Sequence, residues 1–228
     1  WSGTVRVSGE GGTIDEVDKE ERDYYMFGLP LSLTFNDTLS PPDAVRGVRV
    51  TVSGAPYGGW YADSFSAVRP RVEANAFVRL VKPDALVLGL RGVYGNLLFA
   101  DADDVPPTIR FYSGGGGSVR GYEYQSLGPR NEDNDPLGGN ALAEVSAEGR
   151  WKFTPEWGVV AFVDGGTAFG DAPGQSSQPF DDEMRWGAGV GLRYYTAIGP
   201  VRFDVATPLN PRDDDDSLQF YISIGQRC

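Results

Sequence analysis

The chain has 228 residues, of which 40% are hydrophobic, enough for one large β domain or two small ones. Its 20 Lys and Arg against 32 Asp and Glu give a net charge of -12, which disfavours binding to the phosphates of a nucleic acid. The absence of His and the single Cys exclude a disulfide framework and a cysteine-based metal site, whereas 31 glycines and 12% aromatic residues suit an all-β chain.

Segments in which apolar and polar residues alternate predict about ten β-strands. In chain order they cover residues 4–9, 25–36, 45–57, 69–81, 85–98, 141–153, 158–169, 184–195, 201–208 and 218–226. In segment 141–153 the odd positions are mostly apolar, whereas Glu144, Glu148 and Arg150 occupy even positions. A soluble sandwich would turn such charges outward, so the two faces of these strands are expected to meet different surroundings.

The connections between these segments alternate between short turns and longer loops. A tilted strand needs about nine to eleven residues to cross a bilayer, so this pattern favours an antiparallel outer-membrane β-barrel with periplasmic turns and extracellular loops. The alternative is a soluble barrel or sandwich, in which strands of this length would be unusual. Aromatic residues near strand ends are candidates for the interfacial girdles: Tyr57, Tyr94, Trp151, Trp186, Tyr194 and Tyr195.

Residues 99–140 form the longest predicted loop, and loops of this length are usually functional. A run of glycines, residues 114–117, precedes Arg120 in it. A guanidinium keeps its charge and pairs best with carboxylates away from water, so Arg120 is a candidate latch. The next residue, Gly121, would permit close backbone approach or a positive φ. The alternative is an ordinary exposed loop arginine.

The same residues raise other chemistries. Glycines 114–117 would suit a phosphate cradle, but no Lys follows at P-loop spacing. Asp164 and Glu148 would imitate a glycosidase carboxylate pair, although an adjacent arginine explains them more simply. Acidic clusters such as residues 213–216 are interpreted as solvated loop charge, with divalent-cation binding as the alternative. We predict no catalytic residue, no metal site and no cofactor.

Two motifs stand out. One runs from Arg110 to Gly114 and continues through Val119, Arg120, Gly121 and Tyr122; the other is the strand segment Phe162-Val163-Asp164-Gly165-Gly166. They resemble the loop motif and the F-x-D-x-G strand motif of the superfamily of outer-membrane assembly and translocation proteins that includes BamA and TamA. Residues 126–129, 194–200, 204–210 and 219–225 look most like the TamA branch. Family members carry a sixteen-stranded barrel behind periplasmic POTRA domains. The resemblance therefore implies a single barrel domain over residues 1–228, equivalent to the C-terminal part of that barrel without POTRA domains. Its ten or so strands would close as a smaller barrel, pair with another chain or form an excised part of the larger barrel.

The resemblance also implies a site. The long loop would fold back into the barrel, where Arg120 would contact Asp164 and Glu148 while Tyr122 packs against the wall. The parity of the strands agrees, because Asp164 shares the face of Phe162 and Gly166, and Glu148 lies on the charged face of its strand.

The implied function is non-enzymatic. The barrel would assist insertion or secretion of β-barrel or autotransporter proteins in the outer membrane of a Gram-negative-type bacterium. Its expected partners are the lipid bilayer, unfolded outer-membrane or autotransporter polypeptides and a periplasm-spanning protein, but not nucleic acid. The edge of the last strand would template an incoming strand. We predict the seam at Phe220, Ile222 and Gly225, where a glycine weakens the strand and allows a kink.

The alternative function is a passive pore or structural barrel, truncated or engineered, that has no insertase activity and is plugged by the long loop. Family members usually end on an aromatic residue, whereas this chain ends on Cys228.

Overall fold

The computed structural model describes residues 1–15, 21–39, 43–81, 86–170, 184–196 and 199–225. Cys228 and two predicted strand ends, residues 85 and 226, lie outside the described residues. Within these ranges, no helix has the length and apolar character needed to cross a bilayer. The helical turns are η1 (Ala102–Asp104) and η2 (Pro107–Ile109), both of 3-10 type.

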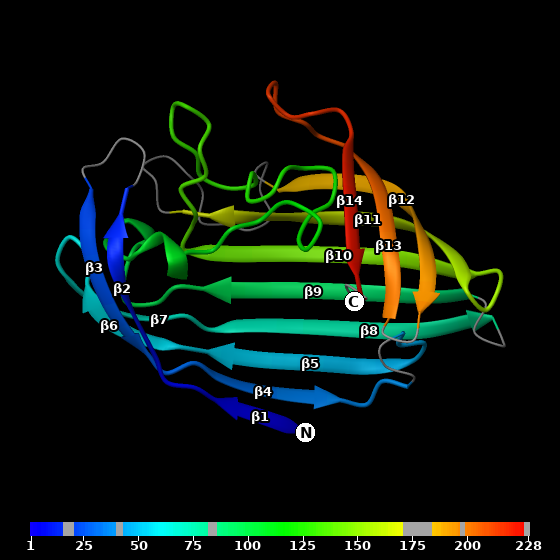
Figure 1. Cartoon of the computed structure of the whole chain (residues 1–228), viewed down its shortest axis with the longest axis horizontal. Coiled ribbons are helices and arrows are strands. Elements are labelled where there is room, and N and C mark those ends of the chain that lie inside the picture. The colour runs from blue at the N-terminus through cyan, green and yellow to red at the C-terminus, as the bar shows by residue number, and fades with distance from the viewer. Residues whose placement is uncertain (16–20, 40–42, 82–85, 171–183, 197–198, 226–228) are drawn as a thin grey trace.

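The predicted all-β antiparallel architecture is confirmed. Ten strands form one sheet in the order β1-β4-β5-β8-β9-β10-β11-β12-β13-β14 (Figure 1). Their bounds are β1 (Ser2–Val5), β4 (Leu31–Asn36), β5 (Gly47–Gly54), β8 (Arg71–Val81), β9 (Leu86–Asn96), β10 (Ala141–Lys152), β11 (Trp157–Phe169), β12 (Arg185–Thr196), β13 (Gly199–Pro208) and β14 (Gln219–Ile224).

A second sheet continues strands β1, β4, β5 and β8 of the first sheet beyond a line of strand breaks, called the crease below. It contains β2 (Ser8–Ile14), β3 (Arg22–Gly28), β6 (Pro56–Trp60) and β7 (Ser64–Val68), in the order β2-β3-β6-β7. The sequence predicts uninterrupted strands over residues 4–9, 25–36 and 45–57, and this detail is wrong. Pro30, Pro56 and Pro70 lie along the crease, and proline has no N–H for the strand ladder. Their carbonyl oxygens still accept hydrogen bonds from neighbouring strands, at 2.9 to 3.1 Å.

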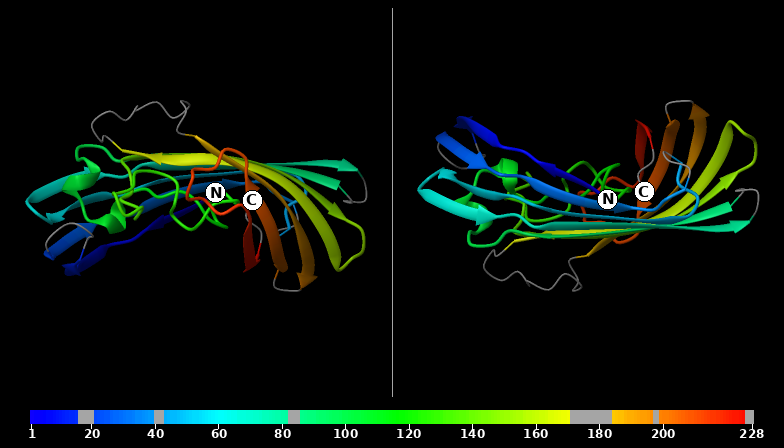
Figure 2. Two further views of the ribbon diagram at one scale, coloured as in Figure 1. Left: turned by 90° about the horizontal axis from the view of Figure 1, so that it is seen from above. Right: turned by 90° about the horizontal axis from the view of Figure 1, so that it is seen from below.

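The ten-stranded sheet is a strongly curved wall. Strands β4 to β10 run alongside one another in Figure 1, whereas β12, β13 and β14 turn across that direction, as the accumulated twist of a large sheet requires. Figure 2 shows the segment between β9 and β10 on the concave side. Strand β1 pairs only with β4, and β14 pairs only with β13, so these two are the sheet edges among the described strands.

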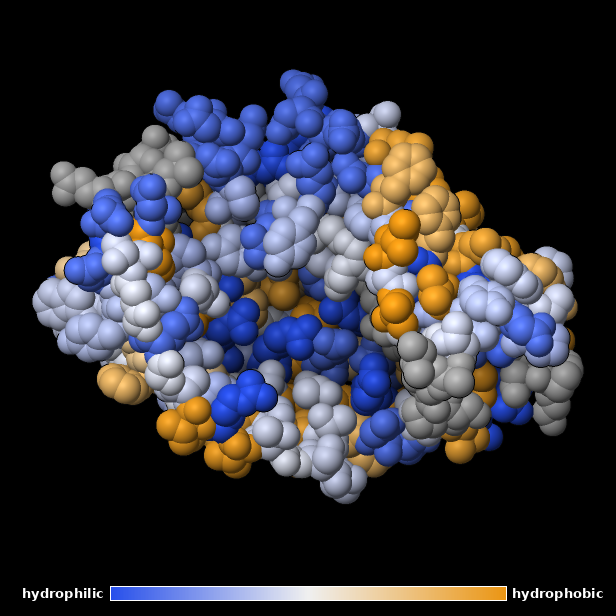
Figure 3. Space-filling model, in the orientation of Figure 1, coloured by the Kyte–Doolittle hydropathy of each residue, from blue (hydrophilic) through white to orange (hydrophobic). Residues whose placement is uncertain are grey.

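The two faces of the wall differ in polarity. On the convex face Val190 and Phe203 are 62% and 42% exposed although both are apolar. On the concave face the charged residues of the same strands are buried, and Figure 3 shows hydrophilic residues gathered in its central hollow. A large exposed apolar surface marks a membrane or protein contact, and this distribution suits a wall between lipid and a polar lumen.

Of the six aromatic residues that are candidates for the girdles, four lie on the convex face and two do not. The four on the convex face are exposed: Tyr94, Trp151, Trp186 and Tyr194. Tyr57 instead packs against a buried core cluster that contains Tyr61 and Phe65, and the Tyr195 ring lies 3.8 Å from the Lys152 ammonium. Neighbouring residues of a strand face opposite sides, so Tyr194 and Tyr195 cannot both meet lipid.

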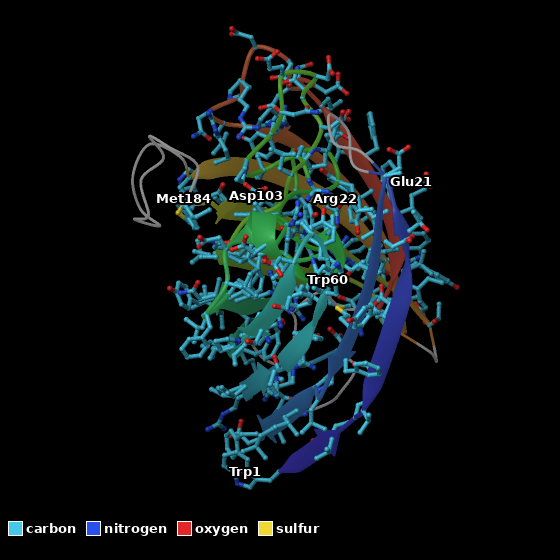
Figure 4. The ribbon with its side chains drawn as sticks, turned by 90° about the vertical axis from the view of Figure 1, so that its left-hand side faces the viewer. Trp1, Glu21, Arg22, Trp60, Asp103 and Met184 are labelled. Atoms are coloured by element: carbon cyan, nitrogen blue, oxygen red, sulfur yellow. The ribbon has the colours of Figure 1, made fainter. Side chains whose placement is uncertain are left out.

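Successive connections lie at opposite ends of the wall, as in an antiparallel meander. The β4–β5 and β10–β11 connections share one end in Figure 1. The β6–β7 connection and the segment after β9 share the other. Figure 4 looks onto this second end, where Arg22 of β3, Trp60 of β6 and Asp103 of η1 are labelled.

Candidate functional site

The connection between β9 and β10, residues 97–140, is called the long loop below; the sequence predicts it as residues 99–140. Arg69 holds its first part against the wall. The Arg69 guanidinium carbon lies 3.9 Å from the ring centroid of Phe111, and its Nε donates to the Ile109 carbonyl oxygen at 2.8 Å. Arg110 joins the two limbs of the loop, because its Nη1 donates to the Leu137 carbonyl oxygen at 2.9 Å.

Arg120 is fully buried between the long loop and the wall. Its Nε lies 2.7 Å from Asp164 Oδ2 and its Nη2 lies 3.1 Å from Asp164 Oδ1, a bidentate pair. Its Nη1 lies 3.0 Å from Glu148 Oε2 and 3.3 Å from Asp204 Oδ2. The guanidinium also stacks on Phe162, with Cζ 3.3 Å from the ring centroid. One loop side chain thus contacts β10, β11 and β13.

Three wall arginines extend this contact into a buried arginine–carboxylate cluster. Arg150 Nε lies 3.1 Å from Glu148 Oε1. Arg193 Nη1 and Arg202 Nη2 lie 2.5 and 3.1 Å from the two carboxylate oxygens of Asp204. Buried charges persist when they are paired, so each arginine stabilises the charged form of the carboxylates that it contacts, and each carboxylate does the same for its arginines. The cluster comprises Arg120, Arg150, Arg193, Arg202, Glu148, Asp164 and Asp204.

The Arg120 guanidinium remains charged in this environment. Burial alone would lower the pKa of Arg120, but the hydrogen bonds and charge of Asp164, with the charges of Glu148 and Asp204, raise that pKa above its ordinary value. The contact is therefore an ion pair between a charged guanidinium and carboxylates.

The hydrophobic and aromatic residues of the loop motif dock beside Arg120. Val119 is buried in a cluster with Tyr122 and Leu127. The Tyr122 hydroxyl lies 3.1 Å from both the Trp186 carbonyl oxygen and Asn210 Oδ1. Burial raises the pKa of Tyr122, so its hydroxyl stays protonated and able to donate.

Glycines let the loop backbone lie directly on the wall. Gly121 has φ +104°, a conformation that favours glycine, and a side chain there would also meet the backbone of β13. Gly187 of β12 faces the Arg120 carbonyl oxygen so closely that no side chain fits. At Gly166 a Cβ would lie 3.0 Å from Val119 Cγ2. The strand-motif glycine thus makes room for the loop motif.

Glu144 of β10 forms a second anchor for the loop, which the sequence does not predict. It is buried and accepts hydrogen bonds from the hydroxyls of Ser113, at 3.0 Å, and Ser118. Arg91 Nη1 lies 3.0 Å from Glu144 Oε2 and balances its charge. The two serines flank the glycine run, so Glu144 closes residues 113–118 into a compact turn.

The surrounding contacts constrain what chemistry the acidic residues can perform. Glu148 and Asp164, the would-be glycosidase pair, both bind Arg120. Asp214 of the acidic run pairs with Arg130 of the long loop at 2.5 Å. In the described ranges, no group of three or more His, Cys, Asp or Glu residues is placed to hold a metal ion. The acids here hold the loop in place.

The predicted seam residues lie at the C-terminal edge of the sheet. Phe220 and Ile222 of β14 are 60% and 77% exposed. Gly225 follows the strand with φ +96°, and its N–H donates to the Pro200 carbonyl oxygen at 2.8 Å. Bonded and non-bonded pairs alternate in an antiparallel ladder, so Tyr221 and Ser223 bond to β13. The backbone N–H and C=O groups of residues 220, 222 and 224 therefore point away from β13; this side of the strand is called the free edge of β14.

Comparison with known proteins identifies the family. The Omp85 superfamily domain matches residues 4–228. The chain belongs to the Omp85 superfamily. It is therefore an outer-membrane protein.

Relatives of this Omp85 chain include two outer membrane protein assembly factors named BamA. The protein from Nitratidesulfovibrio vulgaris is 36% identical over 180 residues, which cover 76% of this chain and 21% of the relative. The protein from Neisseria meningitidis serogroup B is 29% identical over 167 residues, which cover 60% of this chain and 20% of the relative. The chain thus spans about a fifth of the length of these relatives.

A solved BamA structure from Haemophilus ducreyi, lacking POTRA domains 1-3, has the same fold as this Omp85 chain. The TM-score is 0.72 at 21% sequence identity, over 88% of this chain and 42% of that one.

Sequence reasoning places the Omp85 loop motif and two of its acidic contacts but misses several site residues. Asp204, Arg193 and Arg202 join the same cluster. The signal that could have identified them was inward parity, because each occupies the polar face of its strand. Glu144 carries the same signal on the same strand as Glu148.

Proposed function

We propose that this Omp85 chain is part of a non-enzymatic barrel that helps unfolded outer-membrane or autotransporter polypeptides to insert into the membrane or to cross it. Superfamily membership and the names of the BamA relatives support a role in assembly. The observation that carries the mechanism is the free edge of β14, which pairs on one side only among the described strands.

The free edge offers an incoming segment backbone hydrogen-bond partners, which the bilayer does not provide. Unpaired backbone N–H and C=O groups cost several kcal/mol each in hydrocarbon, so a strand that pairs with residues 220, 222 and 224 relieves both partners. The apolar side chains Phe220, Ile222 and Ile224 are exposed and continue the convex face. An added strand would therefore extend the wall with its apolar residues toward lipid.

The ladder between β14 and β13 is short, so it can open to admit another strand. Strand β14 matches six residues of β13, whereas β10 matches twelve of β11. The loop latch has a complementary role in the proposal, because it keeps the long loop on the concave side while the edge strand exchanges partners. A periplasm-spanning partner would meet the end that carries the β4–β5 and β10–β11 connections.

Replacing one edge amide tests this proposal. Ile222→Pro removes an N–H that points away from β13, so the ladder to β13 survives while the templating donor is lost. Ile222→Ala is the matched control, since it shortens the side chain and keeps the N–H. We expect Ile222→Pro to abolish, and Ile222→Ala to retain, the acceleration of folding of an unfolded outer-membrane barrel added to proteoliposomes that contain the full chain. Equal activity of the two variants would contradict templating by the free edge.

The polar concave face supports a second candidate, a passive pore or structural barrel. Planar-bilayer conductance separates the two functions. Ion conductance, without any acceleration of folding by the unmodified chain, would favour the pore.

A further inference from the structure

We propose that Tyr221 is a positioning residue that couples the long loop to the terminal strand β14. Its hydroxyl accepts a hydrogen bond from the Gly121 N–H at 3.0 Å and donates one to the Tyr122 carbonyl oxygen at 2.7 Å. The Tyr221 side chain of the edge strand is thus hydrogen-bonded to the loop backbone directly after Arg120. The proposal rests on the proposed function in one respect only: it takes β14 as the edge strand to which an incoming segment adds.

The position of Tyr221 puts it in contact with the latch as well. It lies opposite Asp204 in the β13–β14 register, and Asp204 binds Arg120. Its ring packs against the buried cluster that contains Phe162, the residue on which Arg120 stacks. A Cβ at Gly116 would lie 3.0 Å from the Tyr221 ring. Loop backbone on both sides of Arg120, at Gly116 and at residues 121 and 122, therefore lies against the Tyr221 side chain.

These contacts matter because β14 has so few others. The strand is six residues long and has one neighbouring strand among those described. Two hydrogen bonds to the loop are a considerable addition to that ladder, and they bypass β13. Coupling of this kind is reciprocal: release of the loop should weaken the β14 pairing, and separation of β14 should loosen the loop motif.

Amide hydrogen exchange of the full chain in lipid nanodiscs tests the coupling. The readouts are the Tyr221 and Ser223 amides, which bond to β13, and the amides of residues 119–122. Tyr221→Phe keeps the ring and removes the hydroxyl, so we expect exchange at both places to rise about five- to thirtyfold, the effect of one or two lost net hydrogen bonds. Tyr194→Phe, on the convex face of β12, is the matched control and should change neither.

A second substitution distinguishes coupling from simple packing. Arg120→Lys replaces the planar fork with a point charge and loosens the loop. With the Tyr221 hydroxyl present, this change should raise exchange in both the loop and β14; in the Tyr221→Phe background it should raise exchange in the loop alone. Equal effects of Arg120→Lys on β14 in the two backgrounds would overturn the proposal.

The single variant gives an independent decision. If the double variant does not fold, unchanged β14 exchange in Tyr221→Phe would overturn the coupling, and the expected rise at both places would support it. The measurement contains no substrate polypeptide. A chain that shows the coupling but does not accelerate folding would refute the proposed function alone.

Discussion

Arg120 divides its contacts unequally among three acids. Asp164 takes Nε and Nη2, whereas Glu148 and Asp204 share Nη1. Removing Asp164 therefore leaves the guanidinium two carboxylates. Removing Arg120 leaves Asp164 without this cation, although Ser146 still donates to its Oδ1 at 2.5 Å.

This asymmetry predicts the outcome of a double-mutant cycle. Arg120→Ala should destabilise the folded protein by about 3 to 5 kcal/mol, as expected when one partner of a buried ion pair is lost. Asp164→Ala should cost less, and the double variant should be little worse than Arg120→Ala alone. Urea unfolding in lipid gives the free energies, and protease sensitivity of the long loop reports its release. Strictly additive free energies would show that the two residues do not interact.

Glu144 gives a separate test of how the loop is held. Glu144→Gln keeps the size of the side chain but removes the charge that faces Arg91 and weakens two serine hydrogen bonds. We expect a loss of about 1 to 3 kcal/mol, with faster amide exchange confined to residues 113–118. Glu123→Gln, at an exposed loop position, is the control. Indistinguishable amide exchange of residues 113–118 in the Glu144→Gln and Glu123→Gln variants would show that Glu144 does not anchor the loop.

The sequence predicts residue orientation better than residue partnership. Strand parity correctly turns Glu148, Asp164 and Asp204 inward. It cannot indicate which acid an arginine 28 to 84 positions away will meet, because that depends on the path of the long loop. The loop motif supplied that information for two acids only.

At the scale of single strands, parity also predicts where a charge is tolerated. Val190→Arg places a guanidinium on the convex face of β12 and should destabilise the barrel by about 2 to 4 kcal/mol if the position is at mid-bilayer. Val190→Leu at the same position should be nearly neutral. Unfolding titrations in lipid measure both, and a smaller loss for Val190→Arg than for Val190→Leu would invert the assigned faces.

Parity alone fails at Gly189. Its inward direction suggests that a small polar residue would be tolerated, but a Cβ there would lie 2.5 Å from Phe162 Cζ and closer still to the Val205 carbonyl oxygen. Gly189→Ser is therefore expected to be strongly destabilising. The proline crease is a similar case: alternation continues through Pro30 and Pro56, whereas the prolines supply no N–H to the strand ladder.

For the whole molecule, alternating connections predict a single orientation in the membrane. Single cysteines in place of Asp63 and Asp214, in a Cys228→Ser background, should be labelled by an impermeant reagent from one side. Cysteines in place of Glu156 and Gly199 should be labelled from the other. Mixed accessibility within either pair would contradict the meander topology. Periodicity and connection lengths suffice to predict this topology, but they carry no information on the pairing of β1 and β14, since edge pairing depends on long-range curvature.

The free backbone groups on β14 are two residues apart, and this spacing limits the registers in which an added strand can pair with β14. Residues 220, 222 and 224 offer backbone groups, and the residues between them do not. A partner can therefore move along this edge only in steps of two residues. A slip of one residue would turn every apolar side chain of the partner toward the polar hollow. The edge is thus permissive about where an incoming segment starts and strict about its phase, which would let one short strand accept many sequences that share only alternation.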